Sequence, residues 1–374
     1  MTHRIVVLGA GYAGLTAANR IAHQVRHAQV TLVNARAQFV ERIRLHQIAA
    51  GQQPREHALR ERLRGAGVEL VIGRVQAIDP DRRQVSLDND TVGSDTVCYD
   101  TLVYALGSAA DTGSVAGVAE HALTVADLDS ARELRKRVPD LAAERGVLAV
   151  VGGGLTGIET ATELAETYSE LRVHLVTVGR PGAWLSARGR AHVHRVFDRL
   201  GIEVHTGAMV TRVRRDVVVL ADGRTLGAGL TVWATGFVVP ALAAQSGLSV
   251  DGHGRILVDQ TLRSRSHPEI YAVGDSATAH RAGGQELRMA CGTALPTGQC
   301  AADAIAARLT GREPRPLKFR YVIQCISLGR RDGLIQFVHA DDSPHEMVLT
   351  GRSAARFKEL VVRGALWTTQ RPIR

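Results

Sequence analysis

Residues 4–34 read RIVVLGAGYAGLTAANRIAHQVRHAQVTLVN, and residues 147–177 read VLAVVGGGLTGIETATELAETYSELRVHLVT, so the chain carries one pattern twice. In each copy an apolar, β-branched run enters a glycine-rich turn, a helix-period segment follows, and a second apolar run ends the unit. Gly9 precedes Asn34 by as many positions as Gly152 precedes Thr177. The repeat therefore predicts two βαβ units of equal length.

Both turns have the spacing G-x-G-x-x-G. In this motif the first glycine permits a tight turn, the second lets the backbone approach a pyrophosphate, and the third lets the helix pack closely on the strand. The positive helix N-terminus then faces the phosphates. Glycine turns that bind nothing are the alternative, which the duplicated strand, turn and helix disfavour. We expect dinucleotide contacts from Gly9, Gly11, Tyr12, Ala13 and Gly14 in the first copy and from Gly152, Gly154, Thr156 and Gly157 in the second.

Each unit departs from the dinucleotide-binding pattern at the end of its second strand. An acidic residue is expected there, to bond a ribose hydroxyl, but the residues present are Asn34 and Thr177. Asparagine still bonds ribose. In the second unit a missing carboxylate removes a repulsion against a 2′-phosphate, and Arg180 follows three positions on, so we expect NADPH to be accepted as well as NADH.

The bulk properties set broad limits. At 374 residues the chain exceeds what one hydrophobic core usually supports, which predicts two or three domains. The net charge of +9 suits polyanionic cofactors, an anionic membrane or nucleic acid alike. Since the sequence lacks a helix-turn-helix or aromatic-basic pattern, we expect no nucleic-acid partner.

Hydropathy and cysteine spacing exclude further classes. The sequence has no run of about 18 apolar residues, so we expect no membrane-spanning helix and a cytoplasmic protein, at most peripheral at the inner face of a membrane. The four cysteines are widely spaced and form no C-x-x-C pair, so we expect buried free thiols, with neither a disulfide framework nor a metal site.

Three more segments match a known arrangement: YDTLVYALGS at 99–108, TVWATGF at 231–237 and IYAVGDSA at 270–277. Together with the two glycine turns, their order resembles the flavoproteins with two dinucleotide-binding domains, the pyridine nucleotide-disulfide oxidoreductase superfamily, over about residues 3–310. The resemblance implies an α/β fold with two Rossmann-like βαβ domains, the second inserted in the first, and a small C-terminal α+β domain. It also implies that FAD and NADH or NADPH are the cofactors.

By this resemblance the domains can be placed. The FAD-binding domain would be discontinuous, with residues 1–117 and 240–316, and the NAD(P)-binding domain would take residues 118–239. A C-terminal interface domain would take residues 317–374.

The resemblance also extends the FAD site beyond the first turn. Asp275 would bond the flavin ribityl chain from the end of an apolar strand, Ile270 to Val273, where ligands of such sheets bind. A turn or helix-cap aspartate is the alternative. Gly107, Gly236 and Gly274 stand in the same three matching segments and are expected to lie beside the cofactors.

Residues 291–309, CGTALPTGQCAADAIAARL, predict a helix that starts at Pro296 and Thr297. A helix N-terminus aimed at the flavin would stabilise the negative charge that develops there on reduction. Thr297, Gly298 and Gln299 are the candidate contacts, and an ordinary capped core helix is the alternative.

Several flavoenzyme classes are disfavoured because their reactive residues are missing. Residues 38–51 lack the redox cysteine pair of dithiol reductases, and residues 108–147 lack the cysteines of sulfide-oxidising relatives. The monooxygenase fingerprint F-x-G-x-x-x-H-x-x-x-W is also absent. What remains resembles type II NADH dehydrogenases and the quinone reductases related to apoptosis-inducing factor, especially GGGLTGIETATEL at 152–164.

Candidate catalytic residues follow from this narrower resemblance and from chemistry. Glu159 would lie near the nicotinamide end of the bound dinucleotide, or else only offset the helix dipole. In the loop that holds Glu41 and Arg42, Arg44 would raise the flavin potential and His46 would return a proton to an acceptor, solvated surface charge being the alternative for each.

The C-terminal tail predicts an amphipathic helix. Its apolar residues Phe357, Leu360, Val361 and Ala365 share a face from which the basic residues are largely absent. Such a helix covers its own domain or a homodimer partner, or rests on an anionic membrane.

We therefore expect an FAD-dependent NAD(P)H oxidoreductase that passes electrons to a quinone-like small acceptor. A ferredoxin reductase, with an acidic protein acceptor, is the first alternative. A non-catalytic binding protein that responds to NAD(H) and FAD is the second.

Overall fold

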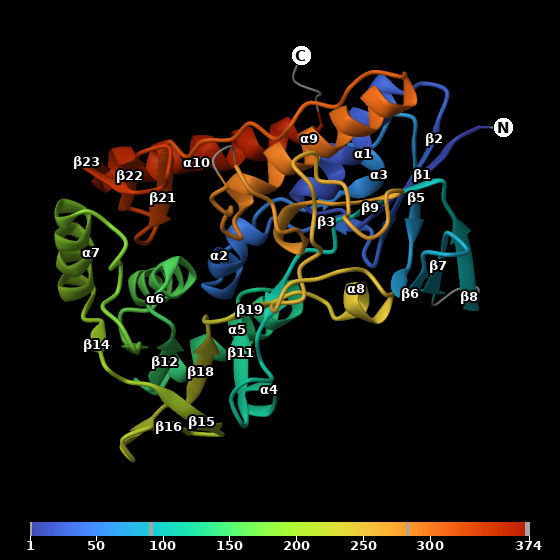
Figure 1. The fold of residues 1–374 in the computed structure, drawn as a ribbon. Coiled ribbons are helices and arrows are strands. Elements are labelled where there is room, and N and C mark those ends of the chain that lie inside the picture. The colour runs from blue at the N-terminus through green and yellow to red at the C-terminus, as the bar shows by residue number, and fades with distance from the viewer. Residues whose placement is uncertain (1, 90–92, 282–283, 371–374) are drawn as a thin grey trace.

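The structure, a computed structural model, describes residues 2–89, 93–281 and 284–370, so the last residues of the C-terminal tail lie outside it. Two parallel sheets dominate the described residues, and an antiparallel sheet with a long helix lies beside them (Figure 1). The predicted α/β class with two Rossmann-like units is confirmed.

Both copies of the sequence repeat fold as βαβ units. The first consists of β1 (Arg4–Leu8), α1 (Tyr12–Gln24) and β2 (Gln29–Asn34). The second consists of β12 (Val147–Val151), α6 (Leu155–Thr167) and β13 (Arg172–Val176). Strands β1 and β12 are apolar and almost completely buried, as expected for strands in the middle of a parallel sheet that is covered on both faces.

The first sheet has the order β20-β9-β1-β2-β5, with every neighbouring pair parallel. Its other strands are β5 (Val68–Ile72), β9 (Thr101–Tyr104) and β20 (Ile270–Ala272). Because β20 returns from far along the sequence to pair with β9, this sheet is built from two separate parts of the chain. Helix α9 (Cys291–Leu309) packs against α1 beside it.

The second sheet lies entirely in the intervening segment and has the order β11-β18-β12-β13-β14, again parallel. Its other strands are β11 (Ala122–Thr124), β14 (Glu203–His205) and β18 (Leu230–Trp233). Helices α5 (Leu128–Ala143) and α7 (Ala187–Leu200) share its apolar core with α6. The insertion of the second unit within the first is therefore confirmed.

The chain crosses between the two sheets twice, and the two crossings touch. Strand β10 (Ala109–Ala110) leads out of the first sheet and β19 (Phe237–Val238) leads back. They pair in antiparallel fashion, Ala109 opposite Val238. This short ladder joins the two units through backbone hydrogen bonds.

Smaller elements surround the two sheets. The strands are β3 (Gln38–Phe39), β4 (His57–Ala58), β6 (Arg74–Asp79), β7 (Gln84–Asn89), β8 (Gly93–Cys98), β15 (Val210–Arg214), β16 (Val217–Leu220) and β17 (Thr225–Gly227). The short helices are η1 (Arg42–Arg44), α2 (Leu45–Ala49), α3 (Leu59–Arg62), α4 (Val118–His121), α8 (Leu242–Gln245) and η2 (Gly274–Ser276).

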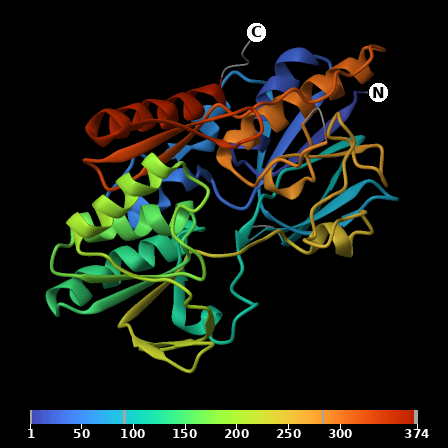
Figure 2. The ribbon, with the colours of Figure 1, turned by 60° about the vertical axis from the view of Figure 1, so that its left-hand side comes forward.

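The C-terminal part forms an antiparallel sheet and one helix, as expected. The sheet contains β21 (Ile323–Ser327), β22 (Gly333–Val338) and β23 (Pro344–Thr350), and the helix is α10 (Gly351–Thr368). Figure 2 shows this sheet and α10 over the helices of the second unit and beside the first unit. The C-terminal part therefore contacts both βαβ units.

Two expectations about helices need correction. Helix α9 begins at Cys291, so the predicted start at Pro296 is wrong and this proline lies inside the helix. Its missing N–H costs one hydrogen bond near the helix start, while packing against α1 holds the turn in place. For α10, the alternative in which the apolar face covers its own domain is wrong, because Leu360 is exposed and Lys358 is buried against an acidic partner.

None of the helices in the described residues is long and apolar enough to cross a membrane.

Candidate active site

The first glycine turn is shaped by contacts that only glycine allows. Gly9 has a φ of +97°, and its N–H donates to the carbonyl of Val33 over 2.8 Å. A Cβ at Gly14 would overlap the carbonyl oxygen of Gly9. A Cβ at Gly11 would meet nothing within 4 Å, so the N-terminus of α1 is open on that side. This cradle fits a dinucleotide pyrophosphate.

The second turn repeats this geometry. Gly152 has a φ of +126°, and its N–H donates to the carbonyl of Val176 over 2.8 Å. A Cβ at Gly157 would overlap the Gly152 carbonyl, whereas a Cβ at Gly154 would meet nothing within 4 Å. Two cradles of the same shape thus stand in one chain, and each fits a dinucleotide.

The strand-end residues support the turns from behind. Asn34 accepts a hydrogen bond from the N–H of Ala10 over 2.9 Å and donates to the carbonyl of Arg36 over 2.7 Å. Thr177 holds the matching place, and its hydroxyl oxygen would lie 2.5 Å from a Cβ at Gly153. Arg180 is exposed just beyond this strand end.

The structure brings four other predicted residues into one network. Ser108 donates to a carboxylate oxygen of Asp275 over 2.6 Å. The N–H of Gly107 donates to the Ser276 hydroxyl over 2.9 Å, and the N–H of Gly274 donates to the Thr297 hydroxyl over 3.0 Å. Asp275 is therefore held at the end of β20, close to the start of α9.

The first residues of α9 have packing roles as well. The Thr297 hydroxyl donates to the Thr293 carbonyl over 3.0 Å and accepts from the Gly274 N–H, so its hydrogen bonds are made within the protein. A Cβ at Gly298 would overlap the carbonyl of Ala13, which explains a glycine where α9 crosses α1. Gln299 is half-buried and has no such constraint.

Three predicted residues lie outside this network. Gly236 has a φ of +71° and belongs to the crossing between the sheets, where its carbonyl accepts from Asp111 over 3.1 Å. Tyr12 is buried at the start of α1, with its ring edge against Phe39 at 5.1 Å between centroids. Thr156 is half-buried in the first turn of α6.

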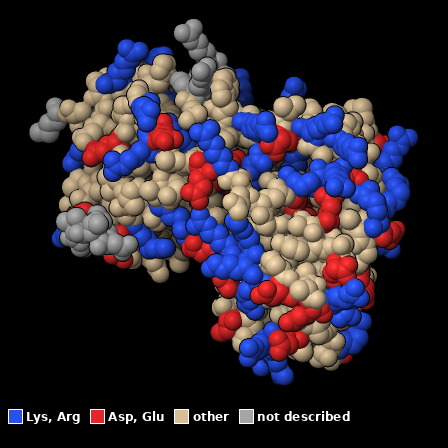
Figure 3. All heavy atoms as spheres, turned by 180° about the vertical axis from the view of Figure 1, so that it is seen from behind, with Lys and Arg blue, Asp and Glu red and all other residues tan. Residues whose placement is uncertain are grey.

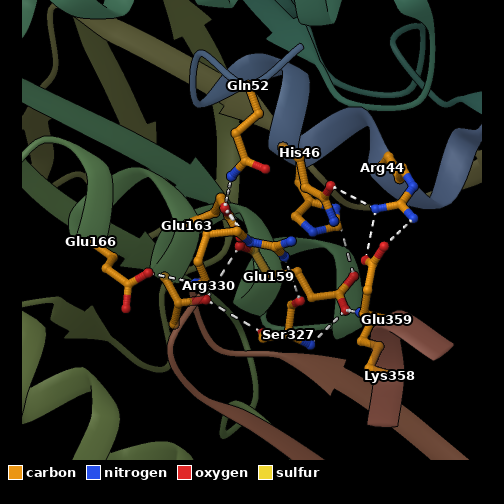
Figure 4. Close-up of polar contacts among 12 residues, drawn as sticks. Arg44, His46, Gln52, Glu159, Glu163, Glu166, Ser327, Arg330, Lys358 and Glu359 are labelled. Atoms are coloured by element: carbon orange, nitrogen blue, oxygen red, sulfur yellow. Dashed lines mark hydrogen bonds and ion pairs between the residues drawn. The ribbon is translucent and has the colours of Figure 1, made fainter. Parts of the chain in front are cut away.

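The three candidate catalytic residues lie together, although they come from distant parts of the chain (Figure 4). Arg44 forms two hydrogen bonds with Glu359 of α10, of 2.8 and 2.9 Å. His46 lies 4.0 Å from Glu159 of α6, measured from Nδ1 to the nearer carboxylate oxygen. The other oxygen of Glu159 accepts from the N–H of Ser327 over 2.8 Å and pairs with Lys358.

Burial decides the charges in this cluster. Burial lowers the pKa of His46 to about 3, even though the Glu159 carboxylate opposes the shift, so His46 is neutral at neutral pH. Burial would raise the pKa of Glu159, but Lys358 and the Ser327 N–H outweigh it and leave that pKa below its usual value. As a neutral imidazole, His46 carries one ring proton, and its predicted role in returning a proton to an acceptor stays a prediction.

A second acidic residue lies one turn further along α6. Glu163 has a fully buried side chain and pairs with Arg330 over 2.8 Å. Burial raises its pKa, although Arg330 and Gln52 oppose the shift. Arg330 also donates to the Ser327 hydroxyl over 3.0 Å.

This cluster borders a cavity of about 660 Å³. Its walls come from α2, the turn between β21 and β22, and α10. Its basic lining residues are Arg44, Arg330, Arg331, Arg352, Arg356 and Lys358, and Glu359 is its acidic lining residue. A cavity of this size accommodates a small organic molecule, and its positive lining favours groups that carry or develop negative charge.

The start of α9 lies next to the Asp275 network, because the Thr297 hydroxyl accepts from the N–H of Gly274. Burial raises the pKa of the thiol of Cys291, the first residue of α9, and the charges of Lys358, Glu159 and Asp275 act on it as well. On the side of β9, a Cβ at Gly107 would lie 3.6 Å from the Arg42 guanidinium. Arg42, rather than Arg44, is therefore the arginine beside the predicted flavin segment.

Sequence reasoning missed several residues of the cluster. Lys358, Arg330 and Glu163 are among its other charged members, and nothing in their local sequence marks them. Lys358 can be recognised as part of the cluster only from the fold, which places this buried lysine of α10 opposite Glu159.

The geometry agrees with what comparison with known proteins finds. The family model for pyridine nucleotide-disulphide oxidoreductases matches residues 3–298. An NADH dehydrogenase-like protein of Mycobacterium tuberculosis is 30% identical over 346 residues, 87% of this chain and 86% of the relative. The demethylphylloquinone reductase of Synechocystis is 28% identical over 348 residues, 89% and 86% of the two chains.

Two further matches show how much of each chain is similar. This chain spans 62% of a probable NADH dehydrogenase of Dictyostelium discoideum, to which it is 28% identical over 292 residues, 68% of its own length. The solved structure of NDH2 from Plasmodium falciparum in complex with NADH superimposes with a TM-score of 0.85, covering 99% of this chain and 96% of that one. At 16% identity, the structural match concerns the fold.

Proposed function

Because the chain belongs to the pyridine nucleotide-disulphide oxidoreductase family, we propose that it transfers a hydride from NADH or NADPH to FAD and passes the electrons to a quinone-like small acceptor. The supporting relatives are named for NADH dehydrogenase and quinone reductase activity. The observation that carries the proposal is the pair of glycine cradles of the same shape, one in each βαβ unit.

The proposal divides the chain as the sequence does. The FAD-binding domain takes residues 1–117 and 240–316, the NAD(P)-binding domain takes residues 118–239, and the C-terminal domain takes the rest. The membership of β20 in the first sheet supports this division, since it returns the chain after the insertion.

In this proposal Gly9, Gly11 and Gly14 hold the FAD pyrophosphate, and Asn34 contacts the ribose. Asp275, oriented by Ser108, holds the ribityl chain. FAD, when bound, would supply the two-electron chemistry between nicotinamide and acceptor. Arg42 and the N-terminus of α9 would place positive potential beside the flavin ring and so favour its reduced form.

The second cradle would hold the nicotinamide dinucleotide, with its pyrophosphate at Gly152, Gly154 and Gly157. Thr177 bears no charge, and Arg180 is exposed close by, so a 2′-phosphate is tolerated. We expect Arg180→Ala to raise the KM for NADPH about tenfold and to leave that for NADH unchanged. Arg195→Ala on α7 is the matched control. Equal effects on both cofactors would contradict this role.

The acceptor would occupy the basic cavity. Lys358 stands in its wall with its ammonium group paired to Glu159, so it can place a positive charge and a proton donor beside an acceptor oxygen. Such a group stabilises the negative charge that develops as the acceptor is reduced. In this proposal Glu159 positions Lys358 rather than contacting the nicotinamide.

Replacing Lys358 tests the acceptor site separately from the hydride step. We expect Lys358→Met to leave flavin bleaching by NADH unchanged and to slow reoxidation by a short-chain quinone about 100-fold. Lys136→Met on the exposed face of α5 serves as control. Unchanged reoxidation would remove Lys358 and the cavity from the proposal, whereas slower bleaching would place Lys358 in the hydride step.

The basic lining also favours a second candidate, in which the acceptor is an acidic protein such as a ferredoxin. Arg331, Arg352 and Arg356 are exposed at the cavity, and basic side chains are plentiful on the face shown in Figure 3. Protein acceptors held by charge bind more weakly at high salt. In that case a ferredoxin would saturate the protein, its affinity would fall as salt is added, and soluble quinones would not be turned over. This result would select the second candidate.

Helix α10 supplies the proposed contact with a membrane surface or a second copy of the chain. Phe357, Leu360, Val361 and Trp367 are exposed on it, Leu360 by 66%. Apolar groups flanked by arginines suit an anionic bilayer. We expect Leu360→Glu to abolish sedimentation with anionic vesicles. If the wild-type protein ignores vesicles and the variant instead changes a dimer to a monomer, the face is a dimer contact.

A further inference from the structure

A cluster of three metal-ligating side chains lies at the edge of the second sheet, away from the cavity. His174 is on β13, and Glu203 and His205 are on the neighbouring edge strand β14. Strand residues two apart point to the same face, which places Glu203 and His205 together. The parallel register sets His174 directly opposite Glu203. Three side chains from two strands therefore converge on one face.

The distances among these groups suit one small cation. The Nε2 atom of His205 lies 3.2 Å from a Glu203 oxygen and 3.3 Å from Nδ1 of His174. The Nε2 atom of His174 lies 3.3 Å from the other Glu203 oxygen. Tetrahedral ligands about 2.0–2.1 Å from a zinc ion stand about 3.3 Å from one another. A single cation takes one nitrogen from each ring and one oxygen, and these three atoms all lie within 4.8 Å of one another, so small side-chain shifts bring them to that spacing.

The chemistry of the cluster points the same way. The two imidazoles face each other through ring nitrogens that can share a single proton, so one hydrogen bond is the most they form together. The rings are 17% and 16% exposed, whereas the Glu203 side chain is 62% exposed. A cation can reach the cluster from solvent and bind side chains that are already held together by the sheet.

We propose that His174, Glu203 and His205 bind one divalent transition-metal ion of the zinc type, with water in the fourth position. Two nitrogen ligands and one carboxylate oxygen suit Zn²⁺ better than Mg²⁺ or Ca²⁺, which prefer oxygen ligands alone. The cysteine spacing gave no sign of this site, because its ligands are histidines and a glutamate brought together by strand pairing.

Metal binding would clamp the edge strand to the strand that ends at the second cradle. The carbonyl of His205 accepts from the N–H of Thr177 over 2.9 Å, so the clamped strand also supports the turn region expected to meet the dinucleotide. A ligand that binds the folded state alone raises its stability. The metal ion would therefore have a structural role, stabilising the folded state, and the site does not depend on the proposed oxidoreductase activity.

Zinc titration of untagged, chelator-treated protein tests the site directly. We expect isothermal titration calorimetry with ZnCl₂ to show one tight site per chain, and Zn²⁺ to raise the Tm. Glu203→Gln should weaken binding at least tenfold and His205→Gln at least 100-fold. In the Co²⁺-loaded protein, the absorption typical of tetrahedral Co²⁺ should appear and should be lost in His205→Gln.

A second pair of histidines supplies the matched control. The rings of His339 and His345 stack with centroids 3.5 Å apart in the C-terminal part, and a metal ion could bind there instead. We expect His345→Gln to bind Zn²⁺ as the wild-type protein does. Loss of binding in His345→Gln, unchanged binding in His205→Gln, or no binding to the wild-type chain would each overturn the proposal.

Discussion

The side chain of His46 shows how burial selects the chemistry available to a residue. It is 4% exposed, and its Nε2 atom has no hydrogen-bond partner within the described part of the chain. Because protonation would place an unsolvated charge there, the imidazole stays neutral far below its ordinary pKa of 6.5. His46 therefore lies beside Glu159 as a neutral group.

This burial predicts a pH dependence of stability. Below pH 6.5 the unfolded chain binds a proton at His46, but the folded chain does not until about pH 3. The free energy of unfolding should therefore fall as the pH drops through this window, by at most about 1.4 kcal/mol per pH unit, and should not depend on His46 above it. Urea unfolding of wild type and His46→Gln from pH 7.5 to 4.5 measures the difference in slope.

The control for this experiment is His27→Gln, which changes an exposed histidine in the loop after α1. It should keep the wild-type slope. An unchanged slope in His46→Gln would mean that His46 takes up its proton in the folded state, and the cluster would then need a different charge assignment.

The pair of Glu159 and Lys358 is a second buried feature at the same scale. Both side chains are at least nine-tenths buried, so removing one partner leaves the other charged without compensation. We expect Glu159→Gln to lower the free energy of unfolding by about 3 kcal/mol or more. The double variant Glu159→Gln with Lys358→Met should recover much of this loss in chemical denaturation. Additive losses would show that the two groups are not coupled.

At the scale of elements, the two cradles can be separated by matched substitutions. A Cβ at Gly14 would overlap Gly9, and a Cβ at Gly157 would overlap Gly152, in the same geometry. We expect Gly14→Ala to release FAD during purification, while Gly157→Ala keeps FAD and raises the KM for NADH at least tenfold. Flavin absorbance and steady-state kinetics measure both effects. Reversed outcomes would exchange the cofactor assignment of the two units.

These cradles could be predicted from the sequence because their determinants are local. The apolar run, the glycines and the helix period lie within about thirty residues, so the pattern contains the strand, the turn and the helix together. The start of α9 could not, because Pro296 favours a helix start locally and contacts with α1 override that preference.

The contacts within the charged cluster could not be predicted from the sequence, because they join residues that are distant along the chain. Glu159 and Lys358 come from α6 and α10, and only the docking of the C-terminal part brings them together. The sequence identified Glu159 through a resemblance, but its partner is one basic residue among several in the tail. The edge cluster of His174, Glu203 and His205 depends in turn on strand register, which the sequence did not define.

At the scale of the whole molecule, the cavity is an assembly of distant parts. Helix α2 of the first unit, the turn between β21 and β22, and α10 each supply part of its wall, and α6 of the second unit supports it through Glu159 and Glu163. Binding at the cavity therefore depends on how the C-terminal part docks on both units. We propose that the two cradles and this cavity act in sequence.

Anaerobic stopped-flow absorbance of the purified protein tests this claim most directly. NADH or NADPH is mixed with the protein while the flavin band is followed, and a short-chain quinone is added in a second mixing step. We expect rapid bleaching by the nicotinamide and recovery of the band on addition of quinone. Bleaching without recovery would contradict the acceptor assignment, and a protein without bound flavin, or without bleaching, would contradict the hydride transfer itself.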